Sequence, residues 1–395
     1  MVRRGAGGFL ALLTLVLLAV PVGTALWGAD KTASYYENRT LAEKPALTWA
    51  GLWDGSFGAA AESWFSDHFP GRLTLLKADT ALQMRLRPVV NGAVLGGEVL
   101  LPFRDYGQWS PSAQAEAAAE RGRAFGALND YVRAEGGTFL FVGLPEQRTY
   151  FAEQYPAYLN SCAEETASAS ALFRQALTER DVPFLDMGEV YDVQGHSREN
   201  YSAVDHHYTF WGAWSAYRAV MERLNALGCG LTPLTREELD VQQLPNPCVG
   251  SRNRKLYNLW PNEERMYIGV QKDPVAYTRW DNGSPSETPL YVLPATAAEP
   301  VTYGMYMGGD YGETILKTDR PGLGRLLIFG DSFTNALEPL LYTSFDETRS
   351  LDLRHYQGGS LKDYIADYQP DVVVCVLNDS FYYTTTGNGA VWEEP

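Results

Sequence analysis

The chain has 395 residues and carries 32 Lys and Arg against 48 Asp and Glu, which gives a net charge of −16. A hydrophobic fraction of 45% can bury a sizeable core, so a wholly disordered chain is excluded. The acidic balance argues against nucleic acid as a partner and against adsorption to an anionic membrane surface, because both interactions need clustered basic residues. The length indicates two domains, or one large domain with an insertion.

The N-terminus has the pattern of an export signal. Arg3 and Arg4 precede an apolar run from Gly8 to Trp27, which is 20 residues long. A basic start followed by an apolar stretch is typical of a cleaved signal peptide, and 20 apolar residues are also enough to span a bilayer. We therefore expect residues 1–27 to form a signal peptide or an N-terminal membrane anchor, with the rest of the chain outside the cytoplasm.

Export permits disulfides, and the chain has four cysteines. Cys375 lies in the apolar run Val372–Leu377, which indicates a buried free thiol. Cys229 and Cys248 bracket a short loop and are the best candidates for a bridge among the three pairings that four cysteines allow.

The remaining chain divides into four parts. Residues 28–95 are predicted to be helical or irregular, with helices on either side of Phe69-Pro70-Gly71. Residues 96–228 alternate strands and helices, and residues 321–395 resume that alternation. Between them, residues 229–320 are rich in Pro, Gly and aromatic residues, which predicts a β-rich insertion. Helices between apolar strands imply an α/β fold with a parallel sheet and right-handed crossovers.

Each predicted element has a sequence signal of its own. Ser110-Pro111 is typical of a helix start, and Thr138–Leu144 is apolar throughout, as in a strand buried on both faces. The strands expected are a hairpin at 93–101, then 138–144, 182–186, 266–270, 275–280, 289–293, 325–329, 350–353 and 372–377. The helices expected are 111–135, 165–180, 210–227, 335–345 and 360–368.

Polar residues follow three strands of the predicted sheet, where ligands of open α/β sheets bind. Gly330-Asp331-Ser332, Gly358-Gly359 and Asn378-Asp379 each follow one of these strands. A Ser at a tight turn between strand and helix presents its hydroxyl outward, and the helix N-terminus beside it offers free N–H groups for an oxyanion. Ser332 is therefore a candidate nucleophile.

A serine nucleophile needs a base, and the best candidate histidine follows an aspartate. In an extended segment, residues two apart face the same way, so we expect Asp205 and His207 to face together and His206 to face away. Thr209 is a plausible N-cap for the helix that begins at Phe210, which places His207 beside a helix N-terminus. Ser332, His207 and Asp205 thus have the side chains of a serine-dependent acyl transfer triad.

Several of these segments resemble a known superfamily. Gly330-Asp331-Ser332, Gly359 and Asn378-Asp379 resemble blocks I, II and III of the SGNH hydrolases, whose fold is a three-layer, flavodoxin-like parallel sheet. The segment 205–209 lies upstream of these blocks, as in the permuted AlgX/AlgJ-like alginate O-acetylation proteins. The resemblance thus assigns residues 96–228 and 321–395 to two parts of one permuted SGNH domain.

The chain resembles most closely the DHHW family of exported bacterial proteins. The shared features, all present in this sequence, are Glu37-Asn38-Arg39, Asp67-His68-Phe69-Pro70 with Arg72, Asp205 to Thr209, Tyr303-Gly304-Met305 and the GDS segment. Tyr208 stands where the family has its eponymous Trp, and the Asp–His spacing of two follows the alginate proteins. Both side chains at position 208 are aromatic, so we expect the packing there to be kept.

The resemblance implies a ping-pong acyl transfer without cofactor or metal. Ser332 would be the nucleophile, His207 the base and Asp205 its partner, and the oxyanion would be bound by the N–H groups of Ser332 and Gly359 and the amide of Asn378. The implied reaction is O-acetyl transfer to, or ester hydrolysis on, a cell-surface or extracellular polysaccharide or cell-wall glycan. A membrane-bound O-acyltransferase is the implied acetyl donor.

Two other functions remain open at this stage. Asp-His-His also occurs in metal-dependent DHH phosphoesterases, but those need further Asp-rich metal motifs at strand ends, and none is visible in this sequence. A catalytically degenerate SGNH domain that binds cell-envelope glycans is the alternative to the enzyme. The aromatic rings of the insertion either form a small hydrophobic core of their own, or one or two of them line an acceptor groove; the candidates are Trp260, Tyr267, Tyr277, Trp280 and Tyr291.

Overall fold

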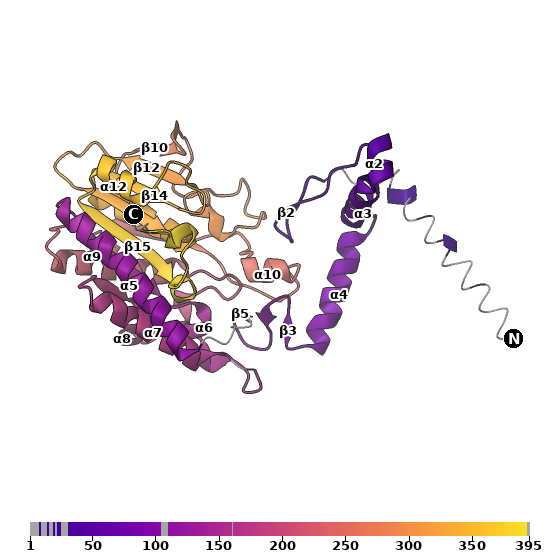
Figure 1. The fold of residues 1–395 in the computed structure, drawn as a ribbon, viewed down its shortest axis with the longest axis horizontal. Helices are drawn as coiled ribbons and strands as arrows, with labels where there is room; N and C mark the ends of the chain where they lie inside the picture. Colours follow the sequence, from indigo (N-terminus) through magenta and orange to yellow (C-terminus); the bar gives the residue numbers. More distant parts are fainter. Residues whose placement is uncertain are drawn as a thin grey trace. The chain divides into compact units, whose positions relative to one another are not determined.

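The computed structural model of the protein describes residues 31–103, 110–159 and 161–392, with isolated positions between 8 and 24. The predicted signal peptide or anchor at 1–27 lies almost wholly outside the described residues. In the part of the chain that is described, no helix is both long and apolar enough to cross a membrane. The chain divides into two compact units, one of residues 1–91 with 253–261 and one of residues 92–252 with 262–395 (Figure 1).

The first unit is built from helices, as expected for residues 28–95. Its elements are β1 (Ala33–Ser34), β2 (Arg39–Thr40), α2 (Trp49–Asp54), α3 (Ser56–His68), α4 (Arg72–Leu86) and β3 (Val89–Val90). Two ion pairs hold it together: Arg39 donates to Asp67 at 2.8 Å, and Arg72 donates to Glu37 at 2.7 and 2.8 Å. All four residues belong to the segments shared with the DHHW family, so these segments stabilise this unit.

The second unit contains an eight-stranded sheet with the order β11-β10-β12-β14-β13-β15-β6-β7. Five neighbouring strands are parallel, and their bounds lie within three residues of the predicted ones. They are β6 (Thr138–Leu144), β7 (Phe184–Asp186), β13 (Arg325–Gly330), β14 (Glu347–Leu351) and β15 (Val372–Asn378). The predicted α/β fold with a parallel sheet is confirmed.

Helices pack against this sheet. The helices of the unit are α5 (Pro111–Ala134), α6 (Gln147–Tyr150), α7 (Ala163–Thr178), α8 (Met187–Val193), α9 (Phe210–Ala226), α11 (Glu338–Leu341) and α12 (Leu361–Tyr368). Alternate strand residues such as Phe141 and Phe329 share a core with side chains of α5, α7 and α12. The residues between them, such as Leu140 and Ile328, are also fully buried, so the sheet is covered on both faces.

The expected helix at 335–345 is not continuous. A 3₁₀ turn at Ser332–Ala336 is followed by α11 and a second 3₁₀ turn at Tyr342–Ser344. Pro339 explains the interruption, because it lacks the N–H that a continuous α-helix would need at this position.

The segment 229–320 contains strands, but it does not form one separate β module. Strands β10 (Thr278–Asp281) and β12 (Glu313–Lys317) extend the main sheet in antiparallel fashion, with β11 (Ser284–Pro285) at its edge. Strands β8 (Leu239–Gln243) and β9 (Tyr267–Gln271) form a separate antiparallel pair. The strand expected at 289–293 is reduced to one bridge between Tyr291 and Tyr306, since prolines at 289 and 294 limit pairing. The hairpin expected at 93–101 forms from β4 (Ala93–Val94) and β5 (Leu101–Pro102).

Candidate active site

Ser332 lies directly beyond the carboxyl end of β13, at the start of a 3₁₀ turn. Gly330 makes this turn sterically feasible, because a Cβ atom there would lie 1.9 Å from the carbonyl oxygen of Val376 on the neighbouring strand β15. Asp331 caps the turn by accepting the N–H of Phe333 at 3.1 Å. The sharp turn after a buried strand leaves Ser332 partly exposed, as predicted for a nucleophile.

Asp331 also links the end of β13 to the end of the neighbouring strand β15. Its Oδ2 accepts the backbone N–H of Asn378 at 3.2 Å and the side-chain amide of Asn378 at 2.8 Å. Burial raises the pKa of Asp331, although hydrogen bonds from Asn378 and Phe333 oppose the rise. This carboxyl group therefore holds Asn378 next to the Ser332 turn.

The candidate base, His207, lies in a loop between α8 and α9. The loop is closed by a bridge between Tyr201 and Tyr208, and inside it the hydroxyl of Ser202 accepts the N–H of Asp205 at 3.0 Å. The loop ends at Thr209, whose hydroxyl caps α9 by accepting the N–H groups of Trp211 and Gly212, as predicted. His207 is thus fixed two residues before a capped helix N-terminus.

Four N–H groups converge on the carboxylate of Asp205. Its Oδ1 accepts the ring Nδ1–H of His207 at 2.6 Å and the backbone N–H groups of His206 and His207 at 2.8 and 3.2 Å. Its Oδ2 accepts the N–H of Ser251 at 2.6 Å. Burial alone would raise the pKa of Asp205, but His207, His206 and the Ser251 N–H together lower it well below its ordinary value. Asp205 is therefore ionised at neutral pH.

An ionised Asp205 decides the tautomer of His207. A carboxylate only accepts, so Nδ1 of His207 carries the proton and Nε2 is left as an acceptor. That Nε2 lies 2.6 Å from the hydroxyl oxygen of Ser332, which then donates to it. Ser332, His207 and Asp205, which lie up to 127 positions apart in the sequence, thus form one hydrogen-bonded chain with both contacts at 2.6 Å.

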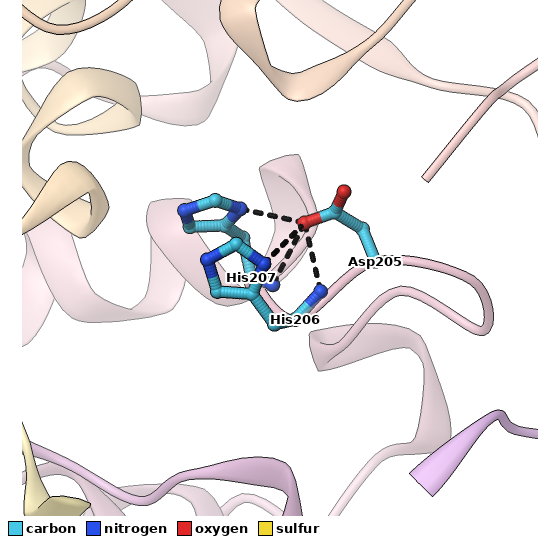
Figure 2. A group of neighbouring side chains, drawn as sticks. All are labelled: Asp205, His206 and His207. Atoms are coloured by element: carbon cyan, nitrogen blue, oxygen red, sulfur yellow. Dashed lines mark hydrogen bonds and ion pairs between the residues drawn. The ribbon is translucent and has the colours of Figure 1, made fainter. Parts of the chain in front are cut away.

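The prediction that His206 faces away from Asp205 is wrong. Nδ1 of His206 lies 3.3 Å from Oδ1 of Asp205 and 2.8 Å from the hydroxyl of Ser251, and the two imidazole rings are 3.7 Å apart. Figure 2 shows both rings turned toward the same carboxylate. The loop is bent rather than extended at these residues, so the alternation of a strand does not apply.

Sequence reasoning missed three groups that support the base. Ser251 bonds both Asp205 and His206, and it can approach only because Gly250 has no side chain: a Cβ there would lie 2.1 Å from the carbonyl oxygen of Val204. Tyr303 stacks on the ring of His207, with centroids 3.6 Å apart and an angle of 5° between the planes. The resemblance to the DHHW family already marked Tyr303, but its role was not visible in the sequence.

Tyr208 keeps the aromatic packing expected at its position and adds a hydrogen bond. Its ring packs edge-on against Phe333 at 4.9 Å, and its hydroxyl donates to the carbonyl of Phe333. The loop of the base is therefore tied to the turn of Ser332 by a side chain next to His207.

Two of the three predicted oxyanion residues, Ser332 and Asn378, lie at the ends of the neighbouring strands β13 and β15. Asn378 ends β15 and uses one amide N–H for Asp331, while its side-chain oxygen accepts the N–H of Ser380 at 3.1 Å. Gly359 has a φ of 114° and open space around it, in the loop between β14 and α12. Its role, like those of the Ser332 N–H and the Asn378 amide, stays a prediction.

Among the described residues, two clusters have ligand atoms close enough to share a cation: Asp205, His206 and His207, and Asp310, Asp352 and His355. In the first, the Nδ1 atoms of both histidines are already bonded to Asp205 or Ser251. In the second, Asp352 accepts from the guanidinium of Arg354 at 2.9 and 3.1 Å. Both clusters have internal partners that satisfy their charges.

The two predictions about the cysteines have different outcomes. The predicted bridge between Cys229 and Cys248 is wrong: neither thiol is in a disulfide, and Cys248 is buried with its sulfur 3.9 Å from Glu264. Cys375 is a buried free thiol, as predicted. All five insertion rings proposed for an acceptor groove are half-buried, so the groove stays a prediction, and the ring that the described contacts bring onto His207 is Tyr303.

Comparisons with known proteins agree with this fold. Residues 102–278 match the model of a family described as "SGNH hydrolase-like domain, acetyltransferase AlgX". The chain carries an AlgX-like SGNH domain. The matched span contains Asp205 and His207 and ends before Ser332, the candidate nucleophile.

Solved structures share the fold over most of this chain. PatB1 from Bacillus cereus has a TM-score of 0.62 at 23% identity, covering 73% of this chain and 96% of its own. A second PatB1 structure, with a sulfonyl adduct, has a TM-score of 0.60 at 20% identity and covers 73% and 95%. A DHHW family protein from Eubacterium siraeum has a TM-score of 0.57 at 18% identity and covers 75% and 93%. A search of curated proteins finds no match.

Proposed function

We propose that the protein is an exported SGNH-type acyl transfer enzyme that moves an O-acetyl group to, or removes it from, a cell-surface or extracellular polysaccharide. The observation that carries the proposal is the chain of two 2.6 Å hydrogen bonds from Ser332 through His207 to Asp205. The match to a family described as an acetyltransferase supports the choice of an acetyl group.

In the first half-reaction, Ser332 attacks the carbonyl carbon of the acetyl donor. His207 Nε2 takes the hydroxyl proton as the bond forms, and the ionised Asp205 stabilises the resulting imidazolium. The oxyanion is bound by the N–H groups of Ser332 and Gly359 and by the amide of Asn378. The imidazolium then gives its proton to the leaving group, and an acetyl ester remains on Ser332.

In the second half-reaction, His207 takes the proton from an acceptor hydroxyl, whose oxygen bonds to the acetyl carbon. The bond from that carbon to Ser332 breaks, and the proton returns to the serine oxygen. A sugar hydroxyl as acceptor makes the enzyme a transferase, and water makes it an esterase. Neither half-reaction needs a cofactor.

The setting we propose is outside the cytoplasm. Residues 1–27 would direct export, either as a cleaved signal or as an anchor. A membrane-bound O-acyltransferase would supply the acetyl group, and a polysaccharide or cell-wall glycan would receive it. The basis is the N-terminal sequence pattern together with the resemblance to the alginate O-acetylation proteins.

The experiment is intact-protein mass spectrometry after a brief incubation with 4-nitrophenyl acetate. The expected result is one acetyl group on the peptide that contains Ser332, and none on the Ser332→Ala variant. An aryl sulfonyl fluoride should block the same residue, a choice suggested by the sulfonyl adduct in one PatB1 structure. A folded wild-type protein that acquires no adduct with either reagent would instead favour a degenerate, glycan-binding domain.

A further inference from the structure

A cluster of large apolar side chains on the first unit is exposed. Trp49 and Trp53 of α2 are 87% and 94% exposed, and Leu47 and Leu52 beside them are 67% and 48% exposed. Tryptophan is normally buried over most of its surface, so two such rings on one short helix point to a binding surface. We call Leu47, Trp49, Leu52 and Trp53 the tryptophan patch.

The patch lies on one side of α2. Trp49, Leu52 and Trp53 stand at positions i, i+3 and i+4, which are neighbours on a helix surface. Gly51, on the opposite side, is buried, and a Cβ atom there would lie 3.3 Å from the Cβ of Phe57 in α3. The side of α2 at Gly51 therefore packs within the unit, and the tryptophans face away from it.

The chain enters the first unit at the C-terminal end of α3. Nε2 of His68, the last residue of α3, lies 3.0 Å from the carbonyl oxygen of Lys31. Lys31 follows by four residues the end of the apolar run at Trp27, which is predicted to be a signal peptide or an anchor, and four residues span at most about 14 Å. An anchored chain therefore brings this end of α3 close to the bilayer surface.

Helix α3 connects this end to the tryptophan patch. Its 13 residues, Ser56–His68, span about 20 Å, and only Gly55 separates α3 from α2. With α3 lying along the surface, a bilayer that holds the chain near Lys31 also reaches Trp53.

The charge of this part of the chain permits contact with a membrane. Residues 28–91 carry seven Lys and Arg and seven Asp and Glu, so this segment is neutral overall, and the negative net charge of the protein belongs to the residues that follow. The repulsion between an anionic membrane surface and the acidic chain therefore does not act on this segment as a whole. Tryptophan is enriched at membrane interfaces, where its amphipathic ring lies at the level of the lipid headgroups.

We propose that the tryptophan patch binds the headgroup region of the membrane to which the N-terminal segment attaches the chain. The two indole rings and the two leucine side chains enter the interface, and the driving force is the burial of their apolar surface. The contact gives the chain a second attachment besides the N-terminal segment and fixes the orientation of the first unit on the bilayer. It shares with the proposed function only the export of the chain, and it does not depend on acyl transfer.

The test locates lipid contacts on the full-length protein. The protein is reconstituted into phosphatidylcholine vesicles that contain a phosphatidylcholine with a photoreactive group near its headgroup. After irradiation and digestion with trypsin, lipid adducts are quantified by mass spectrometry. Cleavage after Arg39 and Arg72 releases one peptide that contains α2, because Pro45 protects the bond after Lys44. We expect adducts on residues 47–53 of this peptide.

Variants decide whether the tryptophans make the contact. Trp49→Ser together with Trp53→Ser should lower the labelling of peptide 40–72 at least about tenfold, because burying even one large apolar side chain is worth about that factor. Trp49→Phe together with Trp53→Phe keeps two apolar rings and should keep most of the labelling. Val193→Ser in α8 is the matched control: Val193 is 89% exposed in the second unit, and its loss should leave the labelling unchanged.

The proposal is overturned if peptide 40–72 carries no lipid, whether or not the N-terminal peptide does, or if the double serine variant is labelled as strongly as the wild type. A patch that instead cross-links to a second copy of the chain would be a protein contact, which also overturns it. The proposed function fails or stands separately, because acylation of Ser332 by 4-nitrophenyl acetate is measured on the same samples and should be equal in all these variants.

Discussion

Replacing Asp205 by Asn is the most direct test of the proposal that Asp205 supports His207 as the base. Three of the four N–H donors converge on Oδ1 and one on Oδ2, so the amide oxygen of the new side chain will take the position of Oδ1. The Nδ1–H of His207 keeps an acceptor, and the tautomer is preserved. The new amide N–H₂ then faces the N–H of Ser251, which loses its partner.

The magnitudes follow from these contacts. A buried N–H without a partner costs about 1–3 kcal/mol of stability. The loss in catalysis comes from the missing charge: at an effective dielectric of about 20, unit charges about 4 Å apart attract by about 4 kcal/mol. Because each 1.36 kcal/mol is about tenfold in rate, kcat/KM for an acetyl ester should fall roughly 10²–10³-fold.

Asp331→Asn is the matched control. Asp331 is equally buried and also accepts N–H groups, but its bonds go to Phe333 and Asn378. The control should lose stability of similar size and lose less kcat/KM than Asp205→Asn, because it disturbs the Asn378 amide but leaves the charge beside the imidazolium in place. Thermal unfolding separates the two effects. An Asp205→Asn variant that stays within tenfold of wild type, or an Asp331→Asn variant that loses as much activity, would refute the assignment of Asp205.

Three further predictions concern the surroundings of the triad. Tyr303→Phe should keep the unfolding temperature of the wild type, because the Tyr303 hydroxyl is buried without a hydrogen-bond partner among the described residues. Tyr303→Leu should instead lower kcat, because it removes the flat ring that stacks on His207. Gly250→Ala should cost about 1–3 kcal/mol in denaturant unfolding and reduce turnover, since its Cβ would displace the segment that bonds Asp205. Burial, and then the nearby Glu146, raise the pKa of Asp379 from 3.8 to about 7. As the pH rises from about 4 to about 7, the wild type should therefore lose stability relative to Asp379→Asn, by at most about 1.4 kcal/mol per pH unit, and a pH-independent difference would contradict this pKa.

The sheet could be predicted from the sequence because its strands are apolar throughout. Thr138–Leu144 is buried along nearly its whole length, and its bounds as β6 are those expected. A strand that is apolar on both faces is stable only in the interior of a sheet that helices cover on both sides. Its composition alone therefore predicts both the strand and its place in the sheet. The helix expected at 335–345 is not continuous, because Pro339 lacks the N–H that an unbroken helix would need there.

The pairing of Asp205 with His207 was predicted correctly in its outcome but on the wrong ground. The expected extended segment would have turned His206 away, and the loop instead wraps three of its own N–H and ring donors around one carboxylate oxygen. A sequence pattern of period two describes strands and cannot describe a loop whose shape is set by Ser202 inside it and by Ser251 from 46 positions downstream.

The segment 229–320 therefore belongs to the active site rather than beside it. It supplies the N–H of Ser251 to Asp205 and the ring of Tyr303 to His207, and its strands β10 and β12 complete the sheet next to β14. The two recognisable motifs contain the proposed nucleophile, base and carboxylate, but neither contains the groups that fix the carboxylate and the imidazole. A relative that kept both motifs and lacked Gly250-Ser251 and Tyr303 would have an unsupported base, because a buried carboxylate with fewer N–H partners has a higher pKa and stabilises an imidazolium less. Activity in such relatives should follow these two positions of the insertion as closely as it follows the triad itself.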